Sequence, residues 1–380
     1  MATDEGAIAT MTNTQPLAGL LALDLSQGIA GPYCARLLAD HGARVLKVEP
    51  PQGDWMRGLG AGPGGTSASA LYYNLGKESL VLDLKQPRDL ERALALAARA
   101  DVVIESSRPG AMEKLGLGFE AVRARNPSVL YLSISGYGRT GPRASEPLTD
   151  TVAQAFSGYM SINRGRDGTP HKTDTTIIDA VTGLFAFQAV TLALWPGARR
   201  EAWHLDLSLM GSAAAILGPK VLEAAFLGQP PQAINPPAGS YRTSDGWIAV
   251  TLVREEQFHA LAREIGEPDL QSDPRFASFA SRSQNLVPLL EIVAARLAER
   301  TTDEWVARFG AADVLASRIN EFGDWLAEPH VVASGAAPMV EVMPGVSLPV
   351  PQDPGQPPHD RSCPGLGEHT EAVLREFGLG

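Results

Sequence analysis

The sequence predicts an α/β protein with a parallel sheet that helices cover on both faces. Short apolar segments alternate with helical segments through the first half of the chain, and strands that alternate with helices pair in parallel. The 380 residues are too many for one small core, and 44% apolar with 20% charged residues are typical of a globular protein. We therefore expect two domains.

The first strand-helix-strand unit has an apolar run at 20–25, a helix at 33–41 and a strand at 43–48. Pro32 suits the first turn of this helix, because its fixed φ is helical and no N–H is needed there. Gly28 and Gly31, in the turn before it, would let backbone amides approach a phosphate or an adenosine, or would only make the turn tight. The same order then repeats: strand 80–84, helix 87–98, strand 101–104, helix 119–125 and strand 129–134.

A long apolar helix is predicted at 180–195, then a strand at 204–210 and a helix at 213–227. The Pro-rich stretch 230–237 indicates a boundary. Beyond it the pattern predicts a smaller domain with a hairpin at 241–251 and helices at 255–265, 283–300 and 302–309, and a terminal helix at 368–377 that docks back on the large domain. The expected division is a disordered leader 1–15, a large domain 16–228, a small domain 229–335 and a returning segment 336–380.

Composition excludes several classes of function. The net charge of -11 argues against nucleic acid and anionic membranes as partners. No stretch approaches the roughly 20 uninterrupted apolar residues that span a bilayer, and the N-terminus lacks a signal-peptide layout, so we expect a cytoplasmic protein. Cys34 and Cys363 are far apart and the seven histidines lack helical metal-site spacing, so we expect no metal.

Two sequence patterns, one of glycines and one of basic residues, are relevant to ligand binding. Gly60, Gly62 and Gly65 have dinucleotide-loop spacing, but no strand leads into them and Pro63 interrupts the segment, so we interpret it as a plain loop. Basic residues at predicted strand ends indicate a phosphate-rich ligand at the carboxyl edge of the sheet, with solvated surface charge as the alternative for any one of them. They are Lys77, Lys85, Arg108, Lys114, Arg139 and Arg143.

Asp179 is the candidate for chemistry. It stands where the apolar helix 180–195 begins, with Thr182 and Gly183 just beyond. An aspartate at this place most often caps the helix. A carboxylate held there could also act as a nucleophile. The residues alone leave both interpretations open.

Eight ordered segments resemble the family III CoA-transferases, the family of formyl-CoA transferase, carnitine CoA-transferase and the α-methylacyl-CoA racemases. The resemblance implies a large Rossmann-like domain, a smaller α+β domain and an interlocked homodimer. The segments are LALDLSQGIAGPYCARLLADHGARVLKVEPPQGD, NLGKESLVLDLK, ADVVIESSRPGAMEKLGLG, NPSVLYLSISGYGRTGP, LTDTVAQAFSG, IIDAVTG, SDGWIAV and GLGEHTEAVLREFG.

The resemblance implies that Asp179 is the nucleophile, which takes CoA from an acyl-CoA through a mixed anhydride and an aspartyl-CoA thioester and gives it to a carboxylic acid. Coenzyme A is then a substrate, and no cofactor is permanently bound. Gly136 is a candidate oxyanion donor. By the same resemblance the CoA contacts are Gly28 and Ile29 near the nucleotide, Leu82 and Lys85 at the next strand end, and Ser106, Arg108 and Lys114 around the phosphates.

Departures from the family keep alternatives open. The family usually has Arg at the positions of Pro50 and Leu75 and Asn at the position of Ser106. These differences suggest a second hypothesis, that the chain is a catalytically silent CoA-binding homologue. A racemase would need a His before the aspartate that matches Asp150, and this chain has Thr149 there. Asp150 would orient substrate or cap the helix 151–156.

The acids that exchange CoA are not identified by the sequence, and transfer between two carboxylates of one substrate stays open. A second carboxylate could be held by basic residues of the loop 163–173, namely Arg164, Arg166, His171 and Lys172.

Overall fold

The computed structural model describes residues 15–165, 167–195, 201–228, 233, 235–354 and 361–380. The chain divides into two compact units, of which unit 1 comprises Met1–Val221 with Gly335–Gly380 and unit 2 comprises Leu222–Ser334. The leader predicted at 1–15 lies, except for Gln15, outside the described residues.

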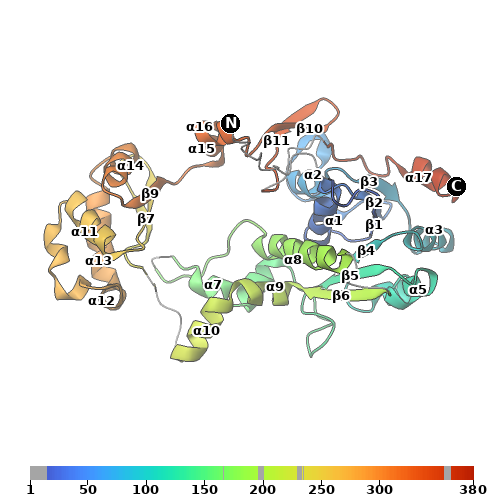
Figure 1. Cartoon of the computed structure of the whole chain (residues 1–380), viewed down its shortest axis with the longest axis horizontal. Helices are drawn as coiled ribbons and strands as arrows, with labels where there is room; N and C mark the ends of the chain where they lie inside the picture. The colour runs from blue at the N-terminus through green and yellow to red at the C-terminus, as the bar shows by residue number, and fades with distance from the viewer. Residues whose placement is uncertain (1–14, 166, 196–200, 229–232, 234, 355–360) are drawn as a thin grey trace, which may run out of the picture. The chain divides into compact units, whose positions relative to one another are not determined.

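Unit 1 is built on a six-stranded sheet of order β3-β2-β1-β4-β5-β6 in which every neighbouring pair is parallel (Figure 1). The α/β fold predicted from the alternating segments is therefore confirmed. The strands are β1 (Leu21–Asp24), β2 (Arg44–Glu49), β3 (Glu78–Val81), β4 (Val102–Glu105), β5 (Leu130–Ser135) and β6 (Trp203–Ser208).

Helices cover both faces of this sheet because successive strand residues point to opposite sides. In β5, Leu130, Leu132 and Ile134 pack with α1 (Ala30–Asp40), α8 (Ile177–Leu194) and α9 (Leu209–Ile216). Tyr131 of the same strand belongs to the core on the other face. That core also contains side chains of α3 (Pro87–Ala97), α5 (Phe119–Arg125) and α17 (Thr370–Glu376).

Helix α8 starts three residues earlier than the predicted 180. Asp179 is therefore the third residue inside the helix, and the N-cap is Thr176.

By length and composition α8 could cross a bilayer, with a mean hydropathy of 1.8 over 18 residues, as could α9 and α10 taken as one bent span. In the fold α8 packs on α1 at Gly183, where a Cβ would come within 2.9 Å of the Ala30 carbonyl oxygen.

The helix predicted at 213–227 is broken. Helix α9 ends at Ile216, and α10 (Gly218–Leu227) continues at a bend of 68°. Pro219 explains the break, because proline is accepted in the first turn of a helix and disfavoured in its interior.

Shorter elements complete unit 1. Leu75, where the family usually has Arg, is fully buried in a small apolar cluster with Leu71, Val340 and Val342. The shorter elements of unit 1 are the 3-10 turns η1 (Trp55–Gly58) and η2 (Pro63–Gly65), the helices α2 (Ala68–Asn74), α4 (Ala111–Leu115), α6 (Asp150–Phe156) and α7 (Tyr159–Ile162), and the hairpin β10 (Met339–Met343) with β11 (Val346–Pro349).

Unit 2 has a three-stranded antiparallel sheet of order β7-β8-β9 with its own apolar core. The predicted hairpin forms β7 (Gly239–Arg242) and β8 (Trp247–Thr251), while β9 (Leu315–Arg318) adds the third strand. The helix predicted at 283–300 is interrupted at Asn285. The helices are α11 (Glu255–Glu264), α12 (Phe279–Gln284), α13 (Leu286–Leu297), α14 (Thr302–Ala311), α15 (Phe322–Ala327) and α16 (Pro329–Ser334), with turns η3 (Pro268–Gln271) and η4 (Pro274–Phe276).

Candidate active site

A cavity of about 390 Å³ lies in unit 1, where the turns after β1, β4 and β5 meet the first turn of α8. Ligands of open parallel sheets bind at this carboxyl edge. Six of the predicted site residues line the cavity: Gly28, Ile29, Ser106, Arg108, Gly136 and Asp179.

Three predicted CoA contacts lie elsewhere. Leu82 follows β3 and is buried in the core of the sheet. Lys85 is exposed just before α3, and Lys114 is exposed on α4. None of the three is among the residues that line the cavity, although each follows the carboxyl end of a strand.

Asp179 is half-buried in the wall of the cavity. Burial, together with the nearby Asp150 carboxylate, raises its pKa to about 7. The side chain is therefore divided between acid and carboxylate near neutral pH, whereas an exposed aspartate is almost fully ionised there. A carboxylate that is costly to ionise is also a stronger nucleophile than an ordinary one.

Asp150 lies behind this carboxylate. It is the first residue of α6, and one of its oxygens accepts the backbone amides of Ile178 at 2.7 Å and Asp179 at 3.1 Å. Its other oxygen accepts the Gln154 amide at 2.6 Å. Gln154 also accepts the Thr173 amide, at 3.0 Å. Asp150 therefore caps α8 and not the helix that it begins.

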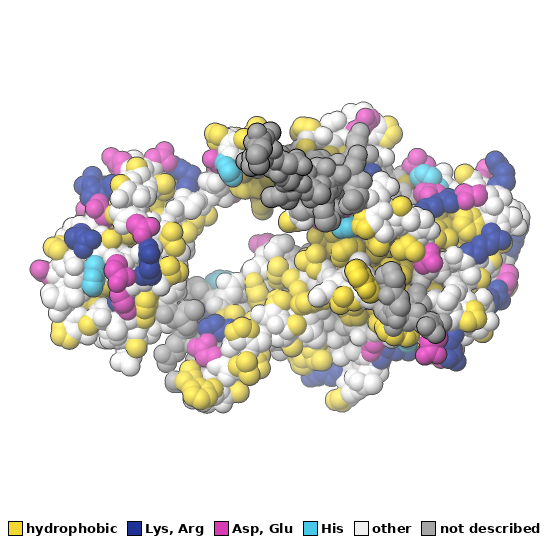
Figure 2. Space-filling view, in the orientation of Figure 1, with side chains coloured by type: hydrophobic (Ala, Val, Ile, Leu, Met, Phe, Trp, Pro, Cys, Tyr) yellow, Lys and Arg dark blue, Asp and Glu magenta, His cyan; other side chains and the backbone are white. Residues whose placement is uncertain are grey.

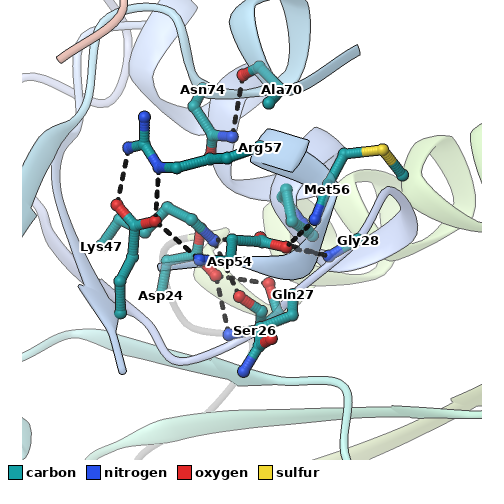
Figure 3. Close-up of polar contacts among 12 residues, drawn as sticks. Asp24, Ser26, Gln27, Gly28, Lys47, Asp54, Met56, Arg57, Ala70 and Asn74 are labelled. Carbon is teal, nitrogen blue, oxygen red and sulfur yellow. Dashed lines mark hydrogen bonds and ion pairs between the residues drawn. The ribbon is translucent and has the colours of Figure 1, made fainter. Parts of the chain in front are cut away.

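The turn after β1 is held by a buried network of charges (Figure 3). The Gly28 amide donates to both oxygens of Asp54, at 3.1 and 3.2 Å. Asp54 in turn forms an ion pair with Lys47 at 3.1 Å, and both side chains are fully buried. The sequence suggested that the Gly28 N–H could bind a phosphate. In the structure Asp54 occupies this N–H, so it is not free for a ligand.

A second buried pair completes the network. Lys77 donates to Asp24 at 2.9 Å and to the Pro32 carbonyl at 2.8 Å. Burial opposes ionisation of Asp24, but Lys47 and Lys77 hold its pKa below the usual value. Burial lowers the pKa of Lys77 to about 8 in spite of the Asp24 carboxylate. Lys77 thus fixes the base of the site and is not available to a ligand.

Trp55 is a wall of the cavity that the sequence reasoning missed. It begins η1, directly after Asp54, and its side chain is 57% exposed. A Cβ on Gly28 would lie 2.7 Å from the Trp55 ring, and Gly28 has φ +85°. Glycine is therefore needed at 28 both for the turn and for the close approach of the indole.

Ser106, which stands where the family usually has Asn, joins two turns. Its hydroxyl accepts the Gln27 amide at 3.0 Å and donates to the Gln27 carbonyl at 3.2 Å. The side chain thus fastens the end of β4 to the turn after β1. Pro50, another of the three departures, follows β2 and does not line the cavity.

The loop proposed to hold a second carboxylate is largely occupied by its own contacts. Arg164 donates to the Ser161 carbonyl at 2.7 Å and to the Gly168 carbonyl at 2.9 Å. Lys172 pairs with Asp174 at 2.5 Å. His171 is exposed, and Arg166 lies outside the described residues. These contacts weigh against Arg164 and Lys172 as acid-binding residues.

Comparisons with known proteins place this chain in a family. The model of CoA-transferase family III matches residues 17–370. The chain belongs to CoA-transferase family III. It is 32% identical over 382 residues to the succinate–glutarate CoA-transferase of Agrobacterium fabrum, with 95% of this chain and 96% of that protein covered.

Other family III members give the same result. The acetyl-CoA:oxalate CoA-transferase of Acetobacter aceti is 32% identical over 380 residues, with 95% of this chain and 96% of that protein covered. The crystal structure of a CAIB/BAIF family protein from Brucella suis superposes with a TM-score of 0.84 at 30% identity and covers 96% of this chain and 100% of that one. The predicted family is confirmed, and this family III member is an enzyme of the CoA-transferase class.

Proposed function

We propose that this enzyme moves CoA from an acyl-CoA donor to a carboxylic acid acceptor, with Asp179 as the nucleophile. The observation that carries the proposal is the position of Asp179, a half-buried carboxylate with a raised pKa in the wall of the cavity at the sheet edge. A perturbed titratable group in such a cavity is typical of a catalytic residue.

In the first half of the reaction an oxygen of Asp179 attacks the thioester carbonyl, and the C–S bond breaks to release CoA thiolate and leave a mixed anhydride. The thiolate attacks the Asp179 carbonyl carbon, the anhydride C–O bond breaks, and the donor acid departs with an oxygen from Asp179. The acceptor carboxylate then reverses both steps. No proton or electron is gained or lost overall.

Arg108 and Gly136 of the cavity, with two lysines outside it, would bind and activate the substrate. Arg108 is the cation among the described residues of the lining, and it would pair with CoA phosphates. Lys85 and Lys114, at the same edge of the sheet, would contact the nucleotide outside the cavity. The Gly136 amide would stabilise an oxyanion. Its Cα approaches Leu148 so closely that a Cβ would lie 2.4 Å from the Leu148 Cβ, which holds the turn in place.

We also propose a homodimer, interlocked as in the family. Apolar side chains of unit 1 gather at the surface over α8 and α9 (Figure 2). A monomer rarely exposes so large an apolar patch. Size-exclusion chromatography with light scattering tests the dimer. The residues of the patch include Leu184, Met210, Ile216, Val221 and Leu192, which is 64% exposed.

The experiment for the activity mixes the enzyme with one acyl-CoA and a panel of carboxylic acids in D₂O and follows products by mass spectrometry. Transfer predicts a new acyl-CoA that depends on the acid, with no deuterium at the α-carbon. Deuterium uptake without a new acyl-CoA would favour the racemase, and CoA binding without either product would favour the silent homologue.

A further inference from the structure

The first turn of α8 has two backbone amides that Asp150 occupies. The opening amides of any helix lack partners within the helix and usually take a carboxylate or hydroxyl from their own chain segment. Here the N-cap Thr176 makes no side-chain bond to the helix, and the acceptor comes from α6, 28 residues away from Ile178. Asp150 is 5% exposed and does not line the cavity.

The Asp179 carboxylate is left without such donors. Within the described part of the chain no hydrogen bond reaches a side-chain oxygen of Asp179, while its own backbone amide is bound by Asp150. A carboxylate in the first turn of a helix ordinarily gains from the amides and the dipole of that turn. Asp150 therefore takes the stabilisation that Asp179 would otherwise receive.

We propose that Asp150 is a positioning residue, which ties α8 to α6 and keeps the Asp179 carboxylate unsolvated by the helix amides and therefore reactive. The inference rests on the proposed role of Asp179 as nucleophile. Asp150 does not touch the substrate. It acts through the orientation and the electrostatic surroundings of Asp179.

The groups around Asp179 are consistent with this role. Tyr73 of α2 and Tyr33 of α1 face the start of α8, and burial raises the pKa of both phenols, so neither carries charge at neutral pH. Arg108 and Glu146 are the other charged residues in the cavity lining, one of each sign. Asp150 is thus the like charge that directly contacts the segment of Asp179.

Gln154 supports Asp150 and supplies a control. Its amide nitrogen donates to Asp150 and also, at 3.4 Å, to the Thr173 carbonyl, and its oxygen accepts the Thr173 amide. Replacing Gln154 by Leu disturbs the same hydrogen-bond network but leaves the Asp150 carboxylate on the two α8 amides. A purely structural role of this network predicts that Asp150 and Gln154 variants behave alike.

The test measures the rate of Asp179 acylation by acyl-CoA, with hydroxylamine trapping and peptide mass spectrometry, from pH 5 to pH 9 in wild type, Asp150→Asn and Gln154→Leu. In the pH profile of the acylation rate, removing the Asp150 charge is expected to move the midpoint of the acidic side down by about 1 pH unit, because a nearby like charge raises a pKa. The plateau rate is expected to fall several-fold, because a less basic carboxylate attacks more slowly. Gln154→Leu is expected to keep the midpoint at or above that of wild type.

A lower plateau with an unmoved midpoint in Asp150→Asn would overturn the inference and leave the proposed function intact. If wild type forms no adduct at Asp179 at any pH, the proposed function itself fails. Asp150→Ser keeps a neutral oxygen for one amide and is expected to show the same downward shift; it replaces Asp150→Asn if that variant does not fold.

Discussion

Asp150 accepts the backbone amide of Asp179 at 3.1 Å, so two carboxylates share the first turn of α8. Burial, together with the Asp150 carboxylate, raises the pKa of Asp179 to about 7. The pair explains why a residue that the sequence suggests as a helix cap is available for chemistry.

Replacing Asp179 by Asn is expected to abolish transfer, with a loss of at least roughly a thousandfold in turnover, because the nucleophile is gone. The folded-state pKa of Asp179 lies above its unfolded value, so this carboxyl lowers the stability of the fold progressively as pH rises from about 4 to about 7, and the full cost is present above that range. The variant should therefore melt at a higher temperature than wild type at pH 8. Asp174→Asn removes an exposed carboxylate paired with Lys172 and serves as the control. Retained turnover in Asp179→Asn would contradict the mechanism.

The rate of CoA transfer should fall as pH decreases through about 7. Protonation removes the nucleophilic form of Asp179, whose pKa is raised to about 7 by burial and by Asp150. An ordinary aspartate would keep the rate constant down to about pH 4. Turnover measured at saturating acyl-CoA and acid gives the profile, and a flat rate from pH 5 to pH 8 would argue against this protonation state.

Arg108→Ala should raise the KM for acyl-CoA roughly tenfold with little change in turnover, since a bond to a charged phosphate is lost in ground and transition states alike. Lys85→Ala should have a smaller effect, because Lys85 is exposed and outside the cavity lining. Equal effects of the two substitutions would show that the phosphates do not lie at Arg108.

Gly28→Ala is expected to displace the Trp55 ring and raise the KM for acyl-CoA several-fold. Gly19→Ala is the matched control, because Gly19 has φ +88° and no atom within 4 Å of an added Cβ. Both variants should lose about 1–2 kcal/mol of stability from the left-handed backbone. If Gly28→Ala leaves the KM unchanged, Trp55 is not a wall of the occupied site.

Lys47→Met should lower the free energy of unfolding by about 3–5 kcal/mol, because it removes a buried cation and leaves Asp54 without its ion pair. Arg123→Met, in the exposed pair with Glu120, should cost less than about 1 kcal/mol. Urea denaturation measures both. A small loss for Lys47→Met would mean that the network does not hold the turn after β1.

The sheet was predictable because short apolar runs stand between helical segments, such as 129–134, which forms β5. The start of α8 was not, because Thr175, Thr176, Ile177 and Ile178 are β-branched and resemble a strand. The helix begins there since Asp150, far away in sequence, supplies the acceptor for its amides.

The candidate site was predictable only in part. Asp179 and Arg108 were found from the resemblance and from their places beside predicted elements. The buried charges Lys47 and Lys77 look in sequence like surface lysines, and only the folded chain brings them to Asp54 and Asp24. Trp55 left one signal, an aromatic residue next to Asp54, which is too common to single out.

The most direct test of the central claim is mass spectrometry of the protein after mixing with a panel of acyl-CoAs, followed by hydroxylamine trapping and peptide mapping. The account predicts a hydroxamate at Asp179 with at least one donor, formed in wild type and absent in Asp179→Asn. An adduct at another residue, or acid-dependent transfer of CoA without modification of Asp179, would contradict it.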